Sequence, residues 1–171
     1  YIVRVNLLDT TEEIWDRVIN TNLKSTFLVT RAVVPLMIER KMGKVLNVSS
    51  LLGLTGMGCS AYTAAQSGLL GLTKAWALEL APYNIQVNCV APGFIRTPGS
   101  DAVHSSPLGK KISGMVPLGT GDTDRLVPAV LFLCSEGADY MTGQCVAVDG
   151  GFTAVHDVGP DFRNMDFGKN K

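Results

Sequence analysis

The chain has 171 residues, the length of one ordinary domain, and 46% of them are apolar, which is enough for a sizeable core. Its 15 acidic residues balance its 15 basic residues, and the absence of a basic stripe argues against a nucleic-acid partner. No run of about 18 apolar residues occurs, so we expect no membrane-spanning helix.

The first half of the chain predicts two helices and two strands. Thr10 and Glu13 have the spacing of a capping box, in which hydroxyl and carboxylate satisfy backbone N–H groups, so a long helix is expected to begin there. Pro35 is expected to kink this helix, because proline lacks an N–H donor. An apolar strand at 44–49 follows, then a helix at 60–80 and a strand at 85–90.

The second half opens with a connection at 91–121 that is rich in proline, glycine and serine. Connections of this length are usually lids or binding loops, so we expect one here, with residues 98–118 facing the substrate. Thr123 is expected to cap a helix that ends near Cys134, and a last strand at 144–148 ends in a structural turn at Asp149-Gly150-Gly151. Residues 154–171 are interpreted as a polar tail after a domain of residues 1–153.

The alternation of strands and helices predicts an α/β protein with a parallel sheet. In such sheets, ligands bind in the crevice at the carboxyl ends of the strands. Three segments lie at these ends, namely Ser49-Ser50, Pro92-Gly93 and Asp149-Gly150. We therefore expect the functional site to form where these segments meet.

Ser50 and Tyr62 form a pair suited to carbonyl or alcohol chemistry. Ser50 closes a strand and Tyr62 opens the next helix, so the serine can hold a substrate oxygen while the phenol gives or takes its proton. A tyrosine has an ordinary pKa of about 10 and needs help to act near neutrality. Both positions also have structural explanations, because a tyrosine can pack on the core and a serine can cap a turn.

The cysteines and histidines show no metal-ligand spacing. The four cysteines are predicted to be reduced, buried small hydrophobes, with a disulfide or a zinc site as the alternative; they are Cys59, Cys89, Cys134 and Cys145. His104 and His156 are predicted to be ordinary surface residues, and no metal is expected. Reduced cysteines and the lack of a signal peptide indicate a cytoplasmic protein.

Four stretches resemble, in the right order, the short-chain dehydrogenase/reductase family, of the 3-oxoacyl-ACP reductase type. N-V-S-S at 47–50 followed by Tyr62 resembles its active-site stretch, and V-N-C-V-A-P-G-F-I-R-T at 87–97 resembles its nicotinamide-facing segment. T-G-Q-C-V-A-V-D-G-G at 142–151 resembles its closing strand, and E-E-I-W-D-R-V-I-N-T-N-L at 12–23 resembles the helix with its relay asparagine. The resemblance covers about residues 10–152 and implies a doubly wound, Rossmann-like sheet. It also implies hydride transfer between NAD or NADP and a small-molecule alcohol or ketone.

The resemblance assigns roles to individual residues. Ser50 would orient the substrate, Tyr62 would act as general acid/base, and Asn22 would hold a relay water through its backbone. The family's serine and tyrosine are one residue further apart, so Ser49 is the alternative serine. The nicotinamide site would be lined by Pro92, Gly93, Ile95 and Thr97.

Gln66 departs from the family pattern Y-x-x-x-K. Residues four apart share a helix face, so Gln66 occupies the place of the lysine that holds the nicotinamide ribose and lowers the tyrosine pKa. Glutamine can do the first and cannot do the second. Lys74 cannot substitute, because it lies twelve residues after Tyr62, about 18 Å along the helix. Two functions therefore stay open: an active oxidoreductase, and a pseudoenzyme that binds a partner or ligand without turnover.

The family begins with a strand and a glycine-rich turn that hold the cofactor pyrophosphate. This chain begins at Tyr1, beyond that segment, so we expect a partial sheet without the first βαβ units and a chain that is inactive by itself. A non-functional truncation is a third possibility. The sequence G-L-T-G-M-G at 53–58 could be mistaken for the missing turn. Its place between Ser50 and Tyr62 indicates instead the turn that brings these two residues together.

The family's strand order, as the resemblance implies it, has a consequence for association. The strand at 44–49 would lose one neighbour, leaving Val45, Leu46 and Val48 on an open edge that invites pairing with other chains. An intact form, by resemblance, would be a homo-oligomer that uses the helices at 60–80 and 123–134 and the strand at 144–148.

Overall fold

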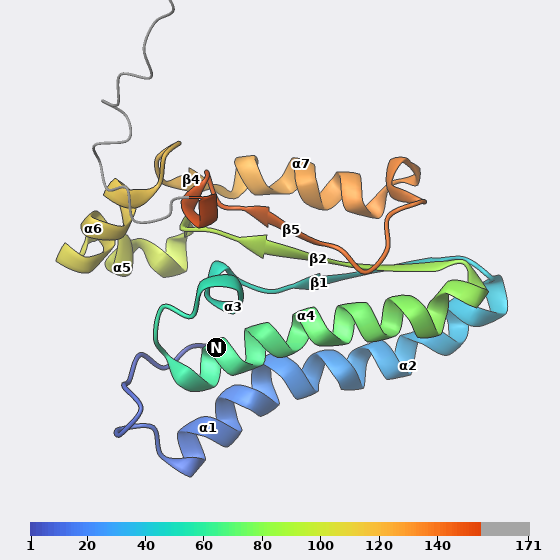
Figure 1. The fold of residues 1–171 in the computed structure, drawn as a ribbon, viewed down its shortest axis with the longest axis horizontal. Helices are drawn as coiled ribbons and strands as arrows, with labels where there is room; N and C mark the ends of the chain where they lie inside the picture. Colours follow the sequence, from blue (N-terminus) through green and yellow to red (C-terminus); the bar gives the residue numbers. More distant parts are fainter. Residues whose placement is uncertain (155–171) are drawn as a thin grey trace, which may run out of the picture.

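A computed structural model describes residues 1–154, so the predicted tail, apart from Ala154, and His156 lie outside the described residues. The described chain forms three layers (Figure 1). The central sheet contains β1 (Gly43–Val48), β2 (Ile85–Pro92) and β5 (Cys145–Val148), all parallel and in the order β1-β2-β5. Helix α7 (Thr123–Cys134) covers one face, and α2 (Ser25–Arg40) and α4 (Ser60–Leu80) lie on the other. The predicted α/β class with a parallel sheet is confirmed.

Helix α4 and strand β2 build the main core. The helix has the bounds that the sequence predicted, and its buried side chains recur at helical spacing; they are Ala61, Ala65, Gln66, Leu69, Thr73, Trp76, Ala77 and Leu80. Ile85 and Val87 of β2 pack against the last of these. A short 3-10 turn at Ala81–Tyr83 and the left-handed Asn84 (φ 57°) then reverse the chain into the strand.

The N-terminal helices differ in detail from the prediction. Helix α1 (Glu12–Ile19) is capped by Thr11, whose hydroxyl accepts a 3.2 Å bond from the Ile14 N–H, whereas Thr10 donates to the Asn6 carbonyl. The capping box predicted at Thr10 is therefore wrong by one residue. The π-helical segment Asn20–Lys24 joins α1 to α2, and α2 continues through Pro35. The helical irregularity thus lies at the π-helical segment, where one turn takes in an extra residue.

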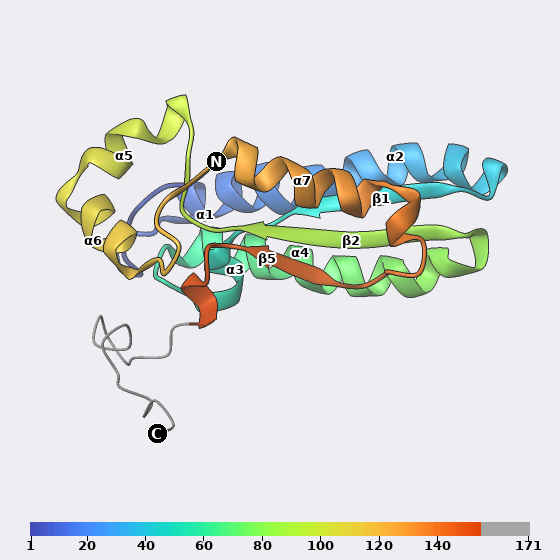
Figure 2. The same ribbon diagram turned by 90° about the horizontal axis from the view of Figure 1, so that it is seen from above.

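The connection after β2 carries structure of its own. It contains β3 (Ile95–Arg96), α5 (Asp101–Ser105), α6 (Pro107–Met115) and β4 (Gly121–Asp122), in addition to a 3-10 turn at Pro98–Ser100. These elements lie beyond the carboxyl ends of β2 and β5, with α5 and α6 outermost (Figure 2). The Asp122 side chain, rather than Thr123, caps α7 by accepting from the Arg125 N–H at 3.2 Å. The remaining short elements are α3 (Leu51–Thr55) and 3-10 turns at Glu136–Ala138 and Phe152–Ala154.

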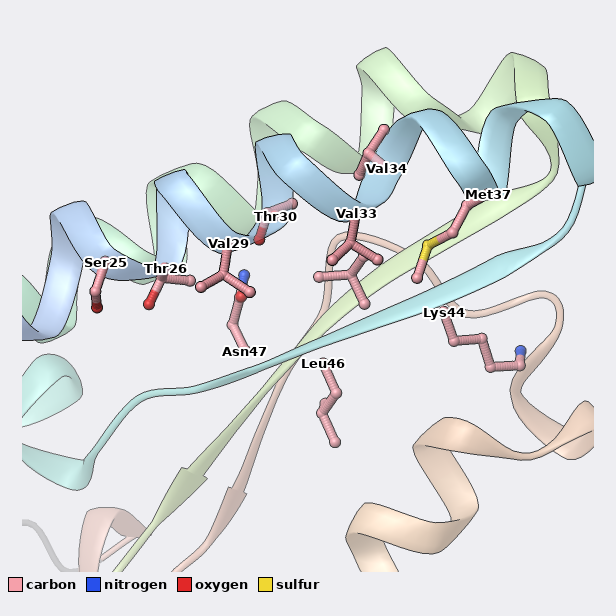
Figure 3. A pocket seen from close by; sticks show the side chains of 11 residues that line it. Ser25, Thr26, Val29, Thr30, Val33, Val34, Met37, Lys44, Leu46 and Asn47 are labelled. Carbon is pink, nitrogen blue, oxygen red and sulfur yellow. The ribbon is translucent and has the colours of Figure 1, made fainter.

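Strand β1 lies at the edge of the three-stranded sheet, as predicted. Val45 and Leu46 are half-buried, and Val48 is 58% exposed. A groove of about 360 Å³ runs between β1 and α2, lined by Val29, Val33 and Met37 on the helix and by Leu46 and Asn47 on the strand, among others. In Figure 3 the α2 side chains lie beside β1, with Asn47 pointing towards the helix and Leu46 away from it. The sheet therefore presents an apolar edge and a groove beside it.

Candidate active site

The turn after β1 positions the two candidate serines differently. The Ser50 hydroxyl caps α3 by accepting from the Leu52 N–H at 3.2 Å, and the side chain is half-buried. This bond uses an acceptor lone pair, so the Ser50 proton is still available to a substrate oxygen. The Ser49 hydroxyl is buried and donates its proton to the Gln66 carbonyl at 2.9 Å. Ser49 thus ties the end of β1 to α4.

The glycine-rich segment 53–58 contains the end of α3 and most of the tight turn that leads to α4. A Cβ on Gly53 would come within 2.9 Å of the Gln66 carbonyl carbon and of the Ser49 hydroxyl, so only glycine allows this close approach. Gly56 and Gly58 have φ values of 65° and 82°, in the left-handed region that favours glycine. These contacts are those of a turn packed on a helix and agree with the interpretation drawn from the sequence.

Tyr62 and Gln66 lie in the first two turns of α4. Tyr62 is half-buried near the helix start, whereas Gln66 is only 4% exposed. Within residues 1–154, the Gln66 Oε1 atom is buried and has no hydrogen-bond partner. A buried acceptor left unpaired costs about 1–3 kcal/mol, which is unusual in a well-packed helix. The position that carries lysine in the resembling family is therefore neutral and unsatisfied here.

Asn22 lies in the π-helical segment that packs beside α4. Its side-chain amide donates to the carbonyls of Tyr1 (2.7 Å) and Val18 (2.9 Å), and its Oδ1 accepts from the Tyr1 amino group at 2.8 Å. The Asn22 backbone carbonyl accepts from the Thr26 hydroxyl at 3.2 Å. π-Helical turns are frequent at functional sites. In this one, hydrogen bonds to backbone groups hold the Asn22 side chain in place.

The turn after β2 is closely packed against the end of β5. The Gly93 N–H donates to the Val148 carbonyl at 2.9 Å, and a Cβ on Gly93 would overlap the Asp149 backbone. The Ile95 N–H returns to the Gly93 carbonyl at 3.0 Å, and the Thr97 N–H is capped by the Ser100 hydroxyl at 2.8 Å. Pro92, Gly93, Ile95 and Thr97 therefore form one ordered turn at the carboxyl end of the sheet.

Asp149 holds the neighbouring turn after β5. Its carboxylate accepts from the Gly151 N–H at 2.9 Å and from the Thr153 N–H at 2.7 Å. Desolvation by burial opposes ionisation, but the bonds from Thr153 and Gly151 together outweigh it and lower the pKa of Asp149 below its ordinary value of 3.8. The structural-turn interpretation of residues 149–151 is consistent with this geometry.

The prediction for His104 was wrong. Its side chain is 3% exposed, its ring lies 3.8 Å from the Phe94 ring between centroids, and its Nε2 lies 3.1 Å from the Ile95 carbonyl oxygen. A Cβ on Gly109 would clash with the Val103 and His104 backbone, so α6 packs directly on α5. The short helices of the connection thus enclose His104. No hydrophobic periodicity in this segment predicted that burial.

A small cavity of about 160 Å³ opens at the carboxyl ends of β2 and β5. Phe94, Leu118 and Arg125 line it together with Val148 and Asp149. The Arg125 guanidinium donates to the Leu118 carbonyl at 3.5 Å. Leu118 ends the connection that was predicted to face the substrate, whereas Phe94 and Arg125 were not singled out as site residues. The three come together only when the connection folds back over the sheet.

The cysteines are all free thiols, but only Cys89 is buried. Cys59 and Cys145 are half-buried and Cys134 is exposed, so the expectation of four buried cysteines was wrong. Among residues 1–154 there is no cluster of three or more His, Cys, Asp or Glu that could hold a metal ion. None of the helices in that range is long and apolar enough to cross a membrane.

The residues present fit only one end of a nicotinamide dinucleotide. The turn from Pro92 to Thr97 would meet the nicotinamide, whereas the unpaired Gln66 Oε1 on α4 is enclosed in this structure. The pyrophosphate needs a glycine-rich turn between a strand and a helix N-terminus. In the described part of the chain the only such segment, 53–58, is packed against α4.

Comparison with known proteins agrees with this arrangement. The family model described as enoyl-(acyl carrier protein) reductase matches residues 2–153. The 3-oxoacyl-[acyl-carrier-protein] reductase of Thermotoga maritima is 46% identical over 142 residues, which are 82% of this chain and 57% of that protein. The (3R)-3-hydroxyacyl-CoA dehydrogenase of Canis lupus familiaris is 43% identical over 148 residues, 85% of this chain and 57% of that protein.

Solved structures give the same result. A protein of Thermus thermophilus superposes with a TM-score of 0.86 at 37% identity, covering 91% of this chain and 67% of that one. A gluconate 5-dehydrogenase from Burkholderia cenocepacia, in complex with NADP and tartrate, superposes with a TM-score of 0.86 at 30% identity. It is covered to 62%, and this chain to 91%.

The chain belongs to the short-chain dehydrogenase/reductase family of NAD(P)-dependent oxidoreductases, and the resemblance seen in its motifs is confirmed. It spans somewhat more than half the length of the relatives named above. The sheet is accordingly a part of the family's Rossmann-like sheet.

Proposed function

We propose that this chain forms the substrate-binding and nicotinamide-facing part of an oxidoreductase that interconverts an alcohol and a ketone. The observation that carries the proposal is the meeting of three segments at one end of a parallel sheet. They are the Ser50 cap after β1, the start of α4 with Tyr62, and the ordered turn that begins at Pro92. This is the edge of the sheet where parallel α/β proteins bind their ligands.

Ser50 and Tyr62 are assigned complementary roles. Ser50 orients the substrate oxygen, because its hydroxyl keeps a proton to donate while Leu52 N–H fixes its position. Ser49 is the weaker candidate, since its proton is held by the Gln66 carbonyl. Tyr62 gives its phenolic proton to the carbonyl oxygen during reduction and takes it back during oxidation. Asn22 supports the proton path through its backbone carbonyl in the π-helical segment.

A bound NADH or NADPH would supply the hydride. Pro92, Gly93, Ile95 and Thr97 would hold its nicotinamide, and the Gln66 side chain would turn outward to accept a hydrogen bond from its ribose. Because the pyrophosphate end is not provided by the described residues, we expect the isolated chain to bind either nucleotide more weakly than micromolar. Calorimetric titration tests this, and a micromolar dissociation constant for the isolated chain would contradict the assignment.

The substrate class to test first comes from the relatives. The relatives act, by their names, on 3-oxoacyl and 3-hydroxyacyl thioesters, and we take a 3-oxoacyl thioester as the first substrate to test. The connection at 98–118 and the cavity beside Phe94 and Arg125 would contact the part of the substrate away from the reacting carbon. We also propose that an intact form assembles with itself through α4, α7 and β5.

A second function, a pseudoenzyme that binds ligand without turnover, is favoured by one observation. Gln66 is buried and neutral where the family has a lysine, so no ammonium stands one helical turn from Tyr62. Such a protein would bind NADPH or a partner through the same turn and leave the substrate unchanged.

The test uses a fusion in which residues 1–171 follow the N-terminal segment of the Thermotoga maritima relative. Consumption of NADPH with a 3-oxoacyl thioester, lost in Tyr62→Phe, would support the oxidoreductase. Calorimetric binding of NADPH or NADH, with no turnover in either reaction direction, would support the pseudoenzyme. A folded fusion that neither binds nor turns over would reject both.

A further inference from the structure

Cys89 and Cys145 lie side by side on adjacent strands. They are Cα partners in the parallel pairing of β2 with β5. Neighbouring strands are about 4.7–4.9 Å apart, which lies within the Cα separation of about 4.4–6.8 Å that a disulfide requires. Paired residues of parallel strands project from the same face of the sheet, so the two thiols point the same way.

That face is the one covered by α4. Asn47, the partner of Cys89 on β1, donates to the Thr73 hydroxyl of α4 at 2.8 Å. The side chains of Asn47, Cys89 and Cys145, which are paired across the three strands, therefore all point towards α4. Cys89 is therefore enclosed between Asn47, Cys145 and the helix, and its side chain is fully buried. Cys145 lies on the last strand of the described sheet and is half-buried in the isolated chain, which leaves it more open to a small solute than Cys89.

The surroundings make the two thiols chemically unequal. The pKa of Cys145 is lowered, because the neighbouring Cys89 thiol and the Lys74 ammonium favour its thiolate and together outweigh desolvation. In the neutral pair, the Cys89 thiol donates to the Val90 carbonyl at 3.5 Å. The pKa of Cys89 is raised far above its ordinary value, because its proton would stabilise the neighbouring Cys145 thiolate, because the side chain is buried and because of the charge on Cys145. A thiolate in a partly exposed, electropositive setting is the reactive form of cysteine.

We propose that Cys145 and Cys89 form an oxidisable dithiol, in which a hydroperoxide reacts with Cys145 and Cys89 then closes a disulfide between β2 and β5. The Cys145 thiolate attacks one peroxide oxygen, the O–O bond breaks, and hydroxide (or an alkoxide) leaves, giving a sulfenic acid. The Cys89 thiol then displaces water from that sulfenic acid to form the S–S bond. The two sulfurs lose two electrons in total, and the peroxide gains them. A small-molecule dithiol returns both cysteines to thiols by exchange.

The position of the bond gives it a consequence. Cys89 lies three residues before Pro92, and Cys145 lies four residues before Asp149. The disulfide would tie together the two strands whose ends hold the Gly93 and Asp149 turns against each other. The other two thiols serve as internal comparisons, because Cys59 lies in the turn before α4 and Cys134 lies on α7, across the sheet.

The experiment treats the reduced chain with hydrogen peroxide and maps its peptides without reduction. We expect one intrachain link between the peptides of Cys89 and Cys145, a mass lower by two hydrogen atoms, and full reversal by dithiothreitol. Cys134→Ser, the matched control, should form the same link at the same rate. Cys89→Ser should accumulate a sulfenic acid at Cys145 that dimedone traps, whereas Cys145→Ser should leave Cys89 reduced.

Lys74→Gln tests the electrostatic part, because Lys74 is exposed and its loss removes charge without opening the core. The oxidation rate near neutral pH should fall several-fold, and its pH midpoint should rise. The same mapping on the fusion protein guards against association of the isolated chain. Links that join different chains, links to Cys134, or a Cys145 that dimedone labels no faster than Cys134 would overturn the proposal.

Discussion

Replacing Gln66 by lysine tests the proposed mechanism most directly, because it changes one charge beside the proposed acid/base. Gln66 follows Tyr62 by one helical turn of α4, which is about 6 Å along the axis. At about 4–6 Å an opposite charge lowers the pKa of an acid by about 1–3 units, and each unit corresponds to about 1.4 kcal/mol. The substitution therefore acts on the phenol with little change in shape.

The expected gain follows from these values. At pH 7 a phenol of ordinary pKa, about 10, is ionised in about one molecule per thousand, so one unit raises the ionised fraction about tenfold. General acid–base catalysis typically contributes about 10²–10⁴-fold in rate. We expect Gln66→Lys to raise turnover by about 10- to 100-fold and to move the pH optimum of alcohol oxidation towards neutrality. Because position 66 is only 4% exposed, the ammonium loses hydration there, so the melting temperature should fall at the same time.

The assay measures kcat against pH in both reaction directions, in the fusion described above. Gln66→Met has a similar length and no charge, so it should show no gain. The double variant Tyr62→Phe with Gln66→Lys should lose the gain, because the lysine acts through the phenol. If the parent fusion and Gln66→Lys have equal turnover and equal pH profiles while Tyr62 is intact, the site works without a tuned tyrosine and the mechanism is wrong.

Three further predictions concern stability and association. Gln66→Met removes an unpaired buried oxygen and should leave the melting temperature of the fusion unchanged or higher. Thr73→Val leaves the Asn47 amide without its acceptor and should cost about 1–3 kcal/mol of unfolding free energy. Equal losses of stability for the two variants in thermal scans would mean that the Gln66 Oε1 has a partner. The isolated chain should associate through the β1 edge, so Val48→Lys should shift it towards monomer in light scattering. The control Leu8→Lys should cause no such shift, because Leu8 is 94% exposed and lies away from the sheet. The lowered pKa of Asp149 stabilises the fold at pH values above its ordinary pKa of 3.8, and this stability is lost as the pH falls through the folded-state pKa. Asp149→Asn should therefore weaken the dependence of the urea unfolding midpoint on pH in the acid range. An unchanged slope below about pH 4 would contradict this.

Much of the fold could be predicted from local patterns. Helix α4 was bounded correctly because apolar residues recur along it at helical spacing and a strand signal follows at Ile85. The parallel sheet followed from the order of strands and helices, whereas the edge position of β1 was expected only from the family's strand order, which the resemblance implied. The cap of α1 was placed one residue early, because Thr10 and Thr11 are equivalent to a pattern, and only the backbone decides which hydroxyl faces the helix.

The candidate site was likewise predictable only in part. The order of the motifs predicted that Ser50, Tyr62 and the turn at Pro92 would gather at one end of the sheet, because parallel strands end at a common edge. The sequence also showed that position 66 is neutral. It did not show that the Gln66 Oε1 would be buried without a partner, because burial of a side-chain atom depends on the tertiary packing around it.

The sequence by itself determined the parallel α/β class, the succession of elements and the family, because these depend on local periodicity and on motif order. Only the tertiary structure decided which side chains meet across long separations. The burial of His104 against Phe94, the cavity beside Arg125, and the pairing of Cys89 with Cys145 each join segments that no local pattern links. The register of β2 against β5 and the folding of the connection over the strand ends set these contacts, and both result from packing of the whole chain.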